Sequence, residues 1–313
     1  MALDFKGRVA IVTGGGGGVG RAHALALAGR GAKVVVNDLG GTVTGAGGSP
    51  TAALAVVEEI RALGGEAIAN GASVTDFDAV QSMVRQAVDT WGRIDIVVSN
   101  ADSAWTYRNL IESQHRKHWT NRRIDNGHYS MGLFVWYFGT SKQYKDVPHH
   151  MMVLGPRYKG LLQDIFKKHK LADDFSLYLH RPTATDPSLA PAGCDTFYVL
   201  SPVPHLDSGT DWPAFAETYR AAIAESLEAS VLPGLRECIV TSKVTTPQDF
   251  QDNLWSYKGA GFGLEPLLLQ SAWFRPHNRS EDVPGLYVVG ASTHPGAGVP
   301  GVLMSAKALE SVV

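Results

Sequence analysis

The sequence has few cysteines, no excess of charge of either sign and no long apolar run. Its two cysteines, Cys194 and Cys238, stand alone without CxxC or CxxH spacing. This pattern argues for a reducing compartment and against a disulfide framework or a structural zinc site, so no metal is predicted. The N-terminus has no signal-peptide pattern, and no apolar run approaches the ~18–20 residues of a membrane span. We therefore expect a cytoplasmic protein.

Acidic and basic residues are nearly balanced, with 28 Lys and Arg against 30 Asp and Glu. Neither half of the chain carries the basic excess that is typical of nucleic-acid binding, so no nucleic-acid partner is predicted. The hydrophobic fraction of 44% is ordinary for a globular protein, and 313 residues are enough for two domains. The expected partner is a small molecule.

Aromatic residues are scarce in the first hundred positions, which contain only three of them but 18 of the 34 glycines. The remainder contains 25 aromatics, 15 of the 16 prolines and 10 of the 11 histidines. A single domain rarely changes composition so abruptly, so we interpret residues 97–102 as a junction. The predicted domains are residues 1–101, 102–284 and 285–313.

The first part alternates short apolar runs with helical patterns. Strands are predicted at 8–13, 33–38, 66–70 and 94–98, and helices at 21–30, 51–63 and 76–91. This alternation predicts an α/β fold with a Rossmann-like parallel sheet in the N-terminal half. The rest of the chain is predicted to be a mixed α+β part.

A glycine-rich turn, residues 14–20, lies between the first strand and the first helix. Glycines let the backbone approach a pyrophosphate, which binds the free amides at the helix N-terminus. The second strand ends in Asp38, where a carboxylate accepts hydrogen bonds from ribose hydroxyls and repels a 2′-phosphate. The pattern favours NAD; the alternative is that Asp38 is only a polar residue that ends the strand.

Residues 5–101 resemble the short-chain dehydrogenase/reductase family through Thr13-Gly14-x-x-x-Gly18-x-Gly20 and Asn100-Ala101. Asn37–Gly41 and the insert after it are similar to the hydroxyacyl-CoA dehydrogenase branch of multifunctional β-oxidation enzymes. Ser73 and Asp102 depart from the family, which has aspartate and glycine there. The resemblance implies an NAD site lined by Gly14, Gly18, Gly20, Asp38, Val74 and Asn100.

The same family needs a catalytic tyrosine with a lysine four residues later on a helix. None of the ten tyrosines is followed by lysine at that spacing, and Tyr137 and Lys142 are five residues apart. No catalytic residue is therefore assigned, and hydride transfer to a hydroxyacyl substrate is expected to be undetectable.

The second part is predicted to be antiparallel, with strands at 131–138, 176–180 and 196–200 and a helix at 212–232 capped by Asp211. Basic residues between 115 and 123 are expected on a solvated face, or alternatively against anionic lipid headgroups. Residues 285–290 are predicted to be a buried strand compatible with the parallel sheet. A glycine-rich loop and a helix at 302–312 follow, a unit that directs amides toward a negatively charged ligand such as a reduced flavin.

Several motifs follow one another along residues 98–313, at 99–102, 138–139, 155–158, 174–180, 201–205, 270–279 and 293–301. Through them this part of the chain resembles the carotenoid desaturase family, the bacterial phytoene desaturases. The resemblance implies an FAD-dependent, membrane-associated enzyme that desaturates a lipid-like polyene. Ser292 departs from the usual glycine of the FAD loop, whose matching residues are Gly290, Gly296, Gly298, Gly301 and Val302.

The front half of such a desaturase, with its own G-x-G-x-x-G unit, is missing. The chain is therefore predicted to be a fusion of two oxidoreductase parts, neither with a complete catalytic set and with an incomplete FAD site. Three hypotheses remain open: an FAD-dependent desaturase-like enzyme, an NAD-binding module without turnover whose C-terminal part is a poorly folded passenger, and an NAD-dependent dehydrogenase.

Overall fold

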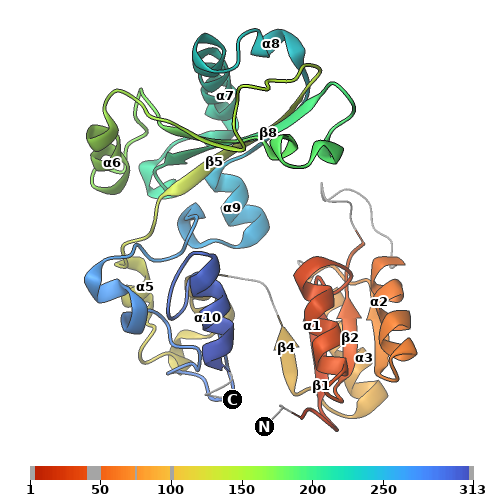
Figure 1. Cartoon of the computed structure of the whole chain (residues 1–313). Coiled ribbons are helices and arrows are strands. Elements are labelled where there is room, and N and C mark those ends of the chain that lie inside the picture. Colours follow the sequence, from red (N-terminus) through yellow and green to blue (C-terminus); the bar gives the residue numbers. More distant parts are fainter. Residues whose placement is uncertain (1–3, 41–50, 75, 99–101, 310–313) are drawn as a thin grey trace. The chain divides into compact units, whose positions relative to one another are not determined.

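The computed structural model describes residues 4–40, 51–74, 76–98 and 102–309 (Figure 1). The chain forms two compact units, and the boundary between them lies between Asn100 and Ala101.

The first unit is built on a four-stranded parallel sheet with the order β3-β2-β1-β4. In-register pairs such as Val9 with Lys33 and Lys33 with Glu66 align the carboxyl ends of the strands at one edge. The sheet confirms the predicted Rossmann-like α/β class, although the last strand is shorter than predicted. The strands are β1 (Val9–Thr13), β2 (Lys33–Asn37), β3 (Glu66–Asn70) and β4 (Ile96–Val98).

Helices cover both faces of this sheet. α1 (Gly18–Ala28) and α2 (Thr51–Ala62) share one hydrophobic cluster with β1 and β2. α3 (Phe77–Trp91) packs Met83 and Ala87 against the other face. The Asp76 carboxylate caps α3 by accepting the amides of residues 78 and 79 at 3.0 and 3.1 Å. The predicted helices are all present, with ends shifted by at most three residues.

The second unit contains a five-stranded antiparallel sheet with the order β6-β7-β8-β5-β9. The predicted apolar strand at 131–138 is β5, which pairs with a neighbour on each side. The outer strands β6 and β9 were not predicted. The strands are β5 (Gly132–Thr140), β6 (His150–Val153), β7 (Leu177–His180), β8 (Asp195–Val203) and β9 (Ile239–Thr245).

One face of this sheet is buried by α7 (Trp212–Ser230), as Figure 1 shows. Phe134 and Trp136 of β5 share a core with Ile223 and Leu227 of α7. The Asp211 carboxylate accepts the Ala214 amide at 3.2 Å and confirms the predicted helix cap. Because side chains alternate along a strand, the residues between these core positions lie on the other face.

Shorter helices complete the second unit. The best defined start belongs to α9, where Thr246 and Asp249 form a reciprocal capping box. Within the described residues, no helix combines the length and hydrophobicity that crossing a bilayer requires. These helices are α4 (Ser103–Trp105), α5 (Asn121–Asp125), α6 (Tyr158–Phe166), α8 (Leu235–Cys238), α9 (Pro247–Leu254) and α10 (Val299–Leu309).

One prediction for the second unit was wrong, and another was correct except at one residue. The buried strand at 285–290 is absent: Tyr287 forms only an isolated bridge to Arg279, and Val289 is 47% exposed. Gly285 and Gly290 have φ of 81° and 116°, so the backbone leaves the extended conformation at both ends. The basic residues between 115 and 123 are exposed as expected, except for Arg116, which is buried and donates to the Trp119 carbonyl.

Asp102, at the start of the second unit, caps α4 by accepting the Trp105 amide at 3.1 Å. Burial raises the pKa of its carboxyl group to about 6, although hydrogen bonds from the Trp105 and Ala104 amides and Ser292 and the charge of Arg275 act in the opposite direction. A raised pKa means that the folded state binds the proton more tightly than the unfolded chain.

The substitution Asp102→Asn should therefore change how stability depends on pH. In the wild type, the free energy of unfolding loses the contribution of this group as the pH rises from about 4 through about 6. Asparagine keeps the cap but does not ionise, so the variant should gain up to ~3 kcal/mol on the wild type over that range. Urea unfolding followed by tryptophan fluorescence measures this, since six of the seven tryptophans follow residue 102.

Asp211→Asn is the matched control, because it replaces an exposed capping aspartate. Equal pH dependence of Asp102→Asn and the wild type would contradict the prediction.

Candidate functional site

The glycine turn of the first unit lies between β1 and α1, as predicted. Gly14 and Gly18 have φ of 64° and 48°, which L-residues with side chains rarely adopt. A Cβ at Gly20 would lie 2.1 Å from the carbonyl oxygen of Gly14, so no larger residue fits there. The N-cap residue Gly17 offers no side chain to the first amides of α1, which leaves them available to an anion.

Asp38 lies directly after β2 and contacts the same turn. Its Oδ2 accepts the Gly16 amide at 2.9 Å and its Oδ1 accepts the Gly40 amide at 2.8 Å. A carboxylate has about four acceptor positions, so these two bonds leave capacity for ribose hydroxyls. The structure thus brings Gly14, Gly18, Gly20 and Asp38 together at the carboxyl edge of the sheet.

Val74 and Asn100 are the two remaining residues of the predicted NAD site. Val74 follows β3 at the same edge and is 40% exposed. The neighbouring polar network is internal, because Asn37 donates to the Asn70 side chain and the Ala72 carbonyl, both at 2.9 Å. Asn100 lies outside the described residues.

The predicted flavin-facing loop of the second unit closes against α10. Gly290, Gly296 and Gly298 have φ of 116°, 144° and 92°. A Cβ at Gly301 would lie 2.5 Å from the Gly296 carbonyl oxygen, so the loop can contact the helix only with glycine there. Val302 lies in the first turns of α10 and is 37% exposed.

A buried hydrogen-bond network fixes this loop to α10. Ser305 is fully buried, and its hydroxyl bonds to the side chains of Thr293 and Asn278, both at 2.9 Å. Thr293 also donates to the Gly290 carbonyl at 2.9 Å. Buried polar groups that find partners specify one arrangement, so the conformation of the loop is set by the helix behind it.

Arg275 is a residue of this site that the sequence did not identify. Its guanidinium is buried and donates to the carbonyls of Ala291 at 2.7 Å and Leu264 at 2.6 Å. It lines a pocket of about 370 Å³ together with Gly296 and a mostly apolar wall. The only signal in the sequence is its position inside the motif at 270–279. The pocket residues are Ser130, Met131, Phe166, Phe262, Leu264, Pro266, Ser271, Arg275, Pro295, Gly296 and Ala297.

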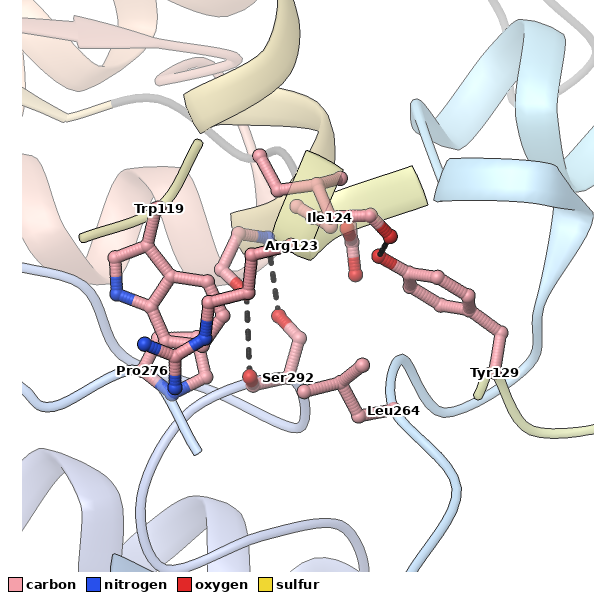
Figure 2. Close-up of a pocket in the computed structure, with 10 residues that line it drawn as sticks. Trp119, Arg123, Ile124, Tyr129, Leu264, Pro276 and Ser292 are labelled. Atoms are coloured by element: carbon pink, nitrogen blue, oxygen red, sulfur yellow. Dashed lines mark hydrogen bonds between the residues drawn. The ribbon is translucent and has the colours of Figure 1, made fainter. Parts of the chain in front are cut away.

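A second, much smaller cavity of about 10 Å³ lies on the other side of the loop residue Ser292 (Figure 2). The Ser292 hydroxyl accepts the Ser103 amide at 3.1 Å, and the Ser103 hydroxyl donates to the Ser292 carbonyl. Arg123 covers the Trp119 ring, with its guanidinium carbon 4.1 Å from the ring centroid. This cavity has room for about one water molecule, so it supports the loop rather than binding a substrate.

Two tyrosines, Tyr137 and Tyr107, are candidates for the catalytic acid or base of a dehydrogenase, and neither has the surroundings of that residue. Tyr137 lies on the strand β5, where a residue at i+4 or i+5 is not on a helical face. Tyr107 is fully buried against Ser280, and burial raises the pKa of its hydroxyl to about 12. A tyrosine hydroxyl with that pKa remains protonated near neutral pH, so it is a poor general acid or base there.

Two family models match different stretches of the chain. Residues 8–122 match the family model described as short chain dehydrogenase. Residues 184–308 match the model described as flavin containing amine oxidoreductase. Among solved structures, a short chain dehydrogenase from Mycobacterium avium is 52% identical over 32% of this chain and 36% of that chain, with a TM-score of 0.28.

The chain is also similar to carotenoid desaturases. It is 55% identical over 223 residues to a neurosporene-forming phytoene desaturase of Rhodobacter capsulatus, covering 70% of this chain and 43% of that protein. It is 45% identical over 271 residues to a lycopene-forming phytoene desaturase of Pseudescherichia vulneris, covering 85% and 55%. The chain spans about half the length of these relatives. It is thus a two-part composite of oxidoreductase sequences, with a first part that matches short-chain dehydrogenases and a second part that is similar to phytoene desaturases.

Proposed function

We propose that the chain is a desaturase-like oxidoreductase whose second part binds FAD and a lipid-like polyene, and whose first part binds NAD. The observation that carries the proposal is the loop at 290–301, which closes on α10 directly beside an apolar pocket of about 370 Å³. A redox cofactor on the loop would face whatever fills that pocket.

The loop has the properties that a flavin requires of its surroundings. Gly296 and Gly298 leave the backbone uncovered by side chains, and α10 begins at the end of the loop with the amides of Val299 and Gly301, while Pro300 between them has none. A bound flavin would take up the hydrogen removed in a desaturation, and a helix N-terminus favours its reduced, anionic ring. Arg275 positions the loop from behind by holding the Ala291 carbonyl.

The pocket suits a substrate without polar groups. Met131, Phe166, Phe262 and Leu264 supply apolar surface, which favours a hydrocarbon chain and excludes water from the reacting carbons.

An exposed apolar segment adjoins this pocket and supports peripheral membrane association. Leu268 is 86% exposed, Leu269 73% and Trp273 67%, and Ser271 between them lines the pocket. Exposed apolar side chains so close in sequence are a marker of protein or membrane contact. A polyene dissolved in a bilayer would then enter the pocket without crossing water.

A second candidate function is an NAD-binding module without turnover. It is favoured by the first unit, where the glycine turn and Asp38 are assembled but no Tyr and Lys pair accompanies them. The two candidates differ in flavin content, so the absorption spectrum of the purified full chain separates them.

The flavin proposal predicts a yellow protein that retains FAD through gel filtration. Gly301→Ala should lower the bound flavin at least tenfold, because its Cβ would collide with the Gly296 carbonyl and displace the loop. Absorbance and released FAD measure the content, and circular dichroism checks folding. Gly17→Ala is the control, since space around Gly17 is open. A wild-type chain that takes up no FAD on reconstitution would refute the proposal.

The NAD proposal predicts that Asp38→Ala weakens NAD binding by about 1–3 kcal/mol, because a ribose hydroxyl pair loses its acceptor. Calorimetry with NAD and NADP distinguishes this cause from a loosened turn, as Asp38 also holds Gly16 and Gly40. Loss of the acceptor weakens the binding of NAD but not that of NADP, whose 2′-phosphate the Asp38 carboxylate repels. The ratio of the NAD affinity to the NADP affinity should therefore fall. Equal losses for both nucleotides, or no NAD binding by the wild type, would contradict it.

The membrane proposal predicts that the full chain sediments with phosphatidylcholine vesicles. Serine at Leu268, Leu269 and Trp273 together should reduce the bound fraction at least tenfold, since each apolar side chain contributes ~1.5–3 kcal/mol when fully buried. The control replaces Leu189, Val240 and Leu254, which are exposed elsewhere, by serine. Binding that needs anionic lipid and survives the first triple variant would instead favour the basic residues near 122–123.

A further inference from the structure

Three histidines gather on the second unit, away from the loop and the pocket. His149, His150 and His180 each offer a ring nitrogen, and these nitrogens lie within 4.8 Å of one another. His150 and His180 are paired in register on the antiparallel strands β6 and β7, and His149 directly precedes β6. The Nε2 atoms of His149 and His180 are 2.7 Å apart.

The cluster is held by a sheet rather than by a loop. It lies at one end of a row of paired residues that runs across four strands, from His150 and His180 to Tyr198 and Tyr137. Leu179, next to His180, is fully buried in the core beneath α7, so the row is on the opposite, open face. Side chains on rigid strands are preorganised for a ligand better than side chains on mobile segments.

Hydroxyl groups orient two of the rings. The Thr185 hydroxyl contacts His149 Nδ1, and the Tyr178 hydroxyl contacts His150 Nδ1 at 2.5 Å. When a hydroxyl accepts the Nδ1 proton, the Nε2 lone pair of that ring is free to bind a metal. Outer hydrogen bonds of this kind are the usual companions of metal-binding histidines.

His180 has one nitrogen that the protein leaves without a partner. Its Nδ1 is buried and makes no hydrogen bond within the described residues, while its Nε2 faces His149. Burial and the two neighbouring rings lower the pKa of His180, which favours its neutral imidazole form. A hydrogen bond between the Nε2 atoms of His149 and His180, 2.7 Å apart, uses one proton, whereas a metal ion between them would take a lone pair from each ring.

We propose that His149, His150 and His180 bind one divalent transition-metal ion of the Zn²⁺ or Cu²⁺ class. A set of imidazoles without thiolate or carboxylate suits these ions. Zn–N bonds of about 2.0–2.1 Å in a tetrahedron place ligand nitrogens roughly 3.4 Å apart. Metal binding therefore requires the Nε2 atoms of His149 and His180 to move apart by less than ~1 Å, a change that rotation of the rings would allow. His150 is exposed, so the remaining position of the ion faces solvent.

Zinc binding by the untagged full chain, stripped with chelator and dialysed, tests the proposal. Calorimetry with ZnCl₂ should give one ion per chain, with affinity reduced about 100-fold or more in His150→Gln and His180→Gln. Tyr178→Phe removes only an orienting hydroxyl and should reduce affinity about tenfold, within the range known for outer-shell partners. His128→Gln, which replaces an exposed histidine of the same unit, should bind as the wild type does.

His150→Gln keeps the test decisive if His180→Gln does not fold, because the His150 ring is exposed and outside the core. With Cu²⁺, paramagnetic resonance should show nitrogen coupling in the wild type that is lost in His150→Gln. An unliganded wild type, or equal zinc affinity in His150→Gln, Tyr178→Phe and His128→Gln, would overturn the proposal.

Discussion

The candidate site of the second unit depends on one buried guanidinium. Arg275 is 3% exposed, and burial lowers its pKa while the charge of Asp102 opposes that shift. Its two short bonds join the Leu264 carbonyl, on one wall of the pocket, to the Ala291 carbonyl at the start of the glycine-rich loop. A buried charge is stable only when it is well paired, so these carbonyls are fixed wherever Arg275 is fixed. Arg275 therefore links the pocket wall to the start of the loop, in addition to the Ser305 network that holds the loop against α10.

A second constraint is common to both units. In the first, Gly20 is the third residue of α1 and has no room for a Cβ beside the Gly14 carbonyl. In the second, Gly301 is the third residue of α10 and has no room beside the Gly296 carbonyl. In both places the first glycine of the turn has positive φ and folds its carbonyl back against the helix. The same steric requirement thus places uncovered amides at a helix N-terminus in two unrelated sequences, which is the arrangement that dinucleotide phosphates and reduced flavins favour.

The strands and helices that could be predicted from the sequence are those that a local residue pattern determines. Runs of β-branched residues and helical periodicity identified every strand and helix that the structure describes in the first unit, and also β5, β7, β8, α7 and α10 of the second. The edge strands β6 and β9 were missed because their residues are polar or half exposed, and only pairing with β7 and β5 makes them strands. Residues 285–290 have the apolar pattern of a strand. In the structure, however, the Val288 amide donates to the Asn278 carbonyl, and Tyr287 forms only an isolated bridge to Arg279. Here tertiary contacts override propensity.

The same distinction separates the predicted from the unpredicted parts of the site. Glycines and Asp38 belong to a motif that is continuous in sequence, whereas Arg275 acquires its role from carbonyls 11 and 16 residues away. The histidine cluster joins residues 31 positions apart through strand register. Cysteine spacing, on which the expectation of no metal rested, carries no information about such a cluster.

Because the chain is a composite of two parts, each part needs a hydrophobic core of its own to hold a binding site. The second unit has its own aromatic core, in which Phe134 packs against Trp212 and Tyr219 with ring centroids 5.7 and 4.9 Å apart. The first unit has separate aliphatic clusters on the two faces of its sheet. A core of this kind stabilises the backbone on which a binding loop rests, and it argues against the second part as a poorly folded passenger. The physical case for a flavin-binding and substrate-binding second part therefore depends on geometry that this part supplies from its own residues.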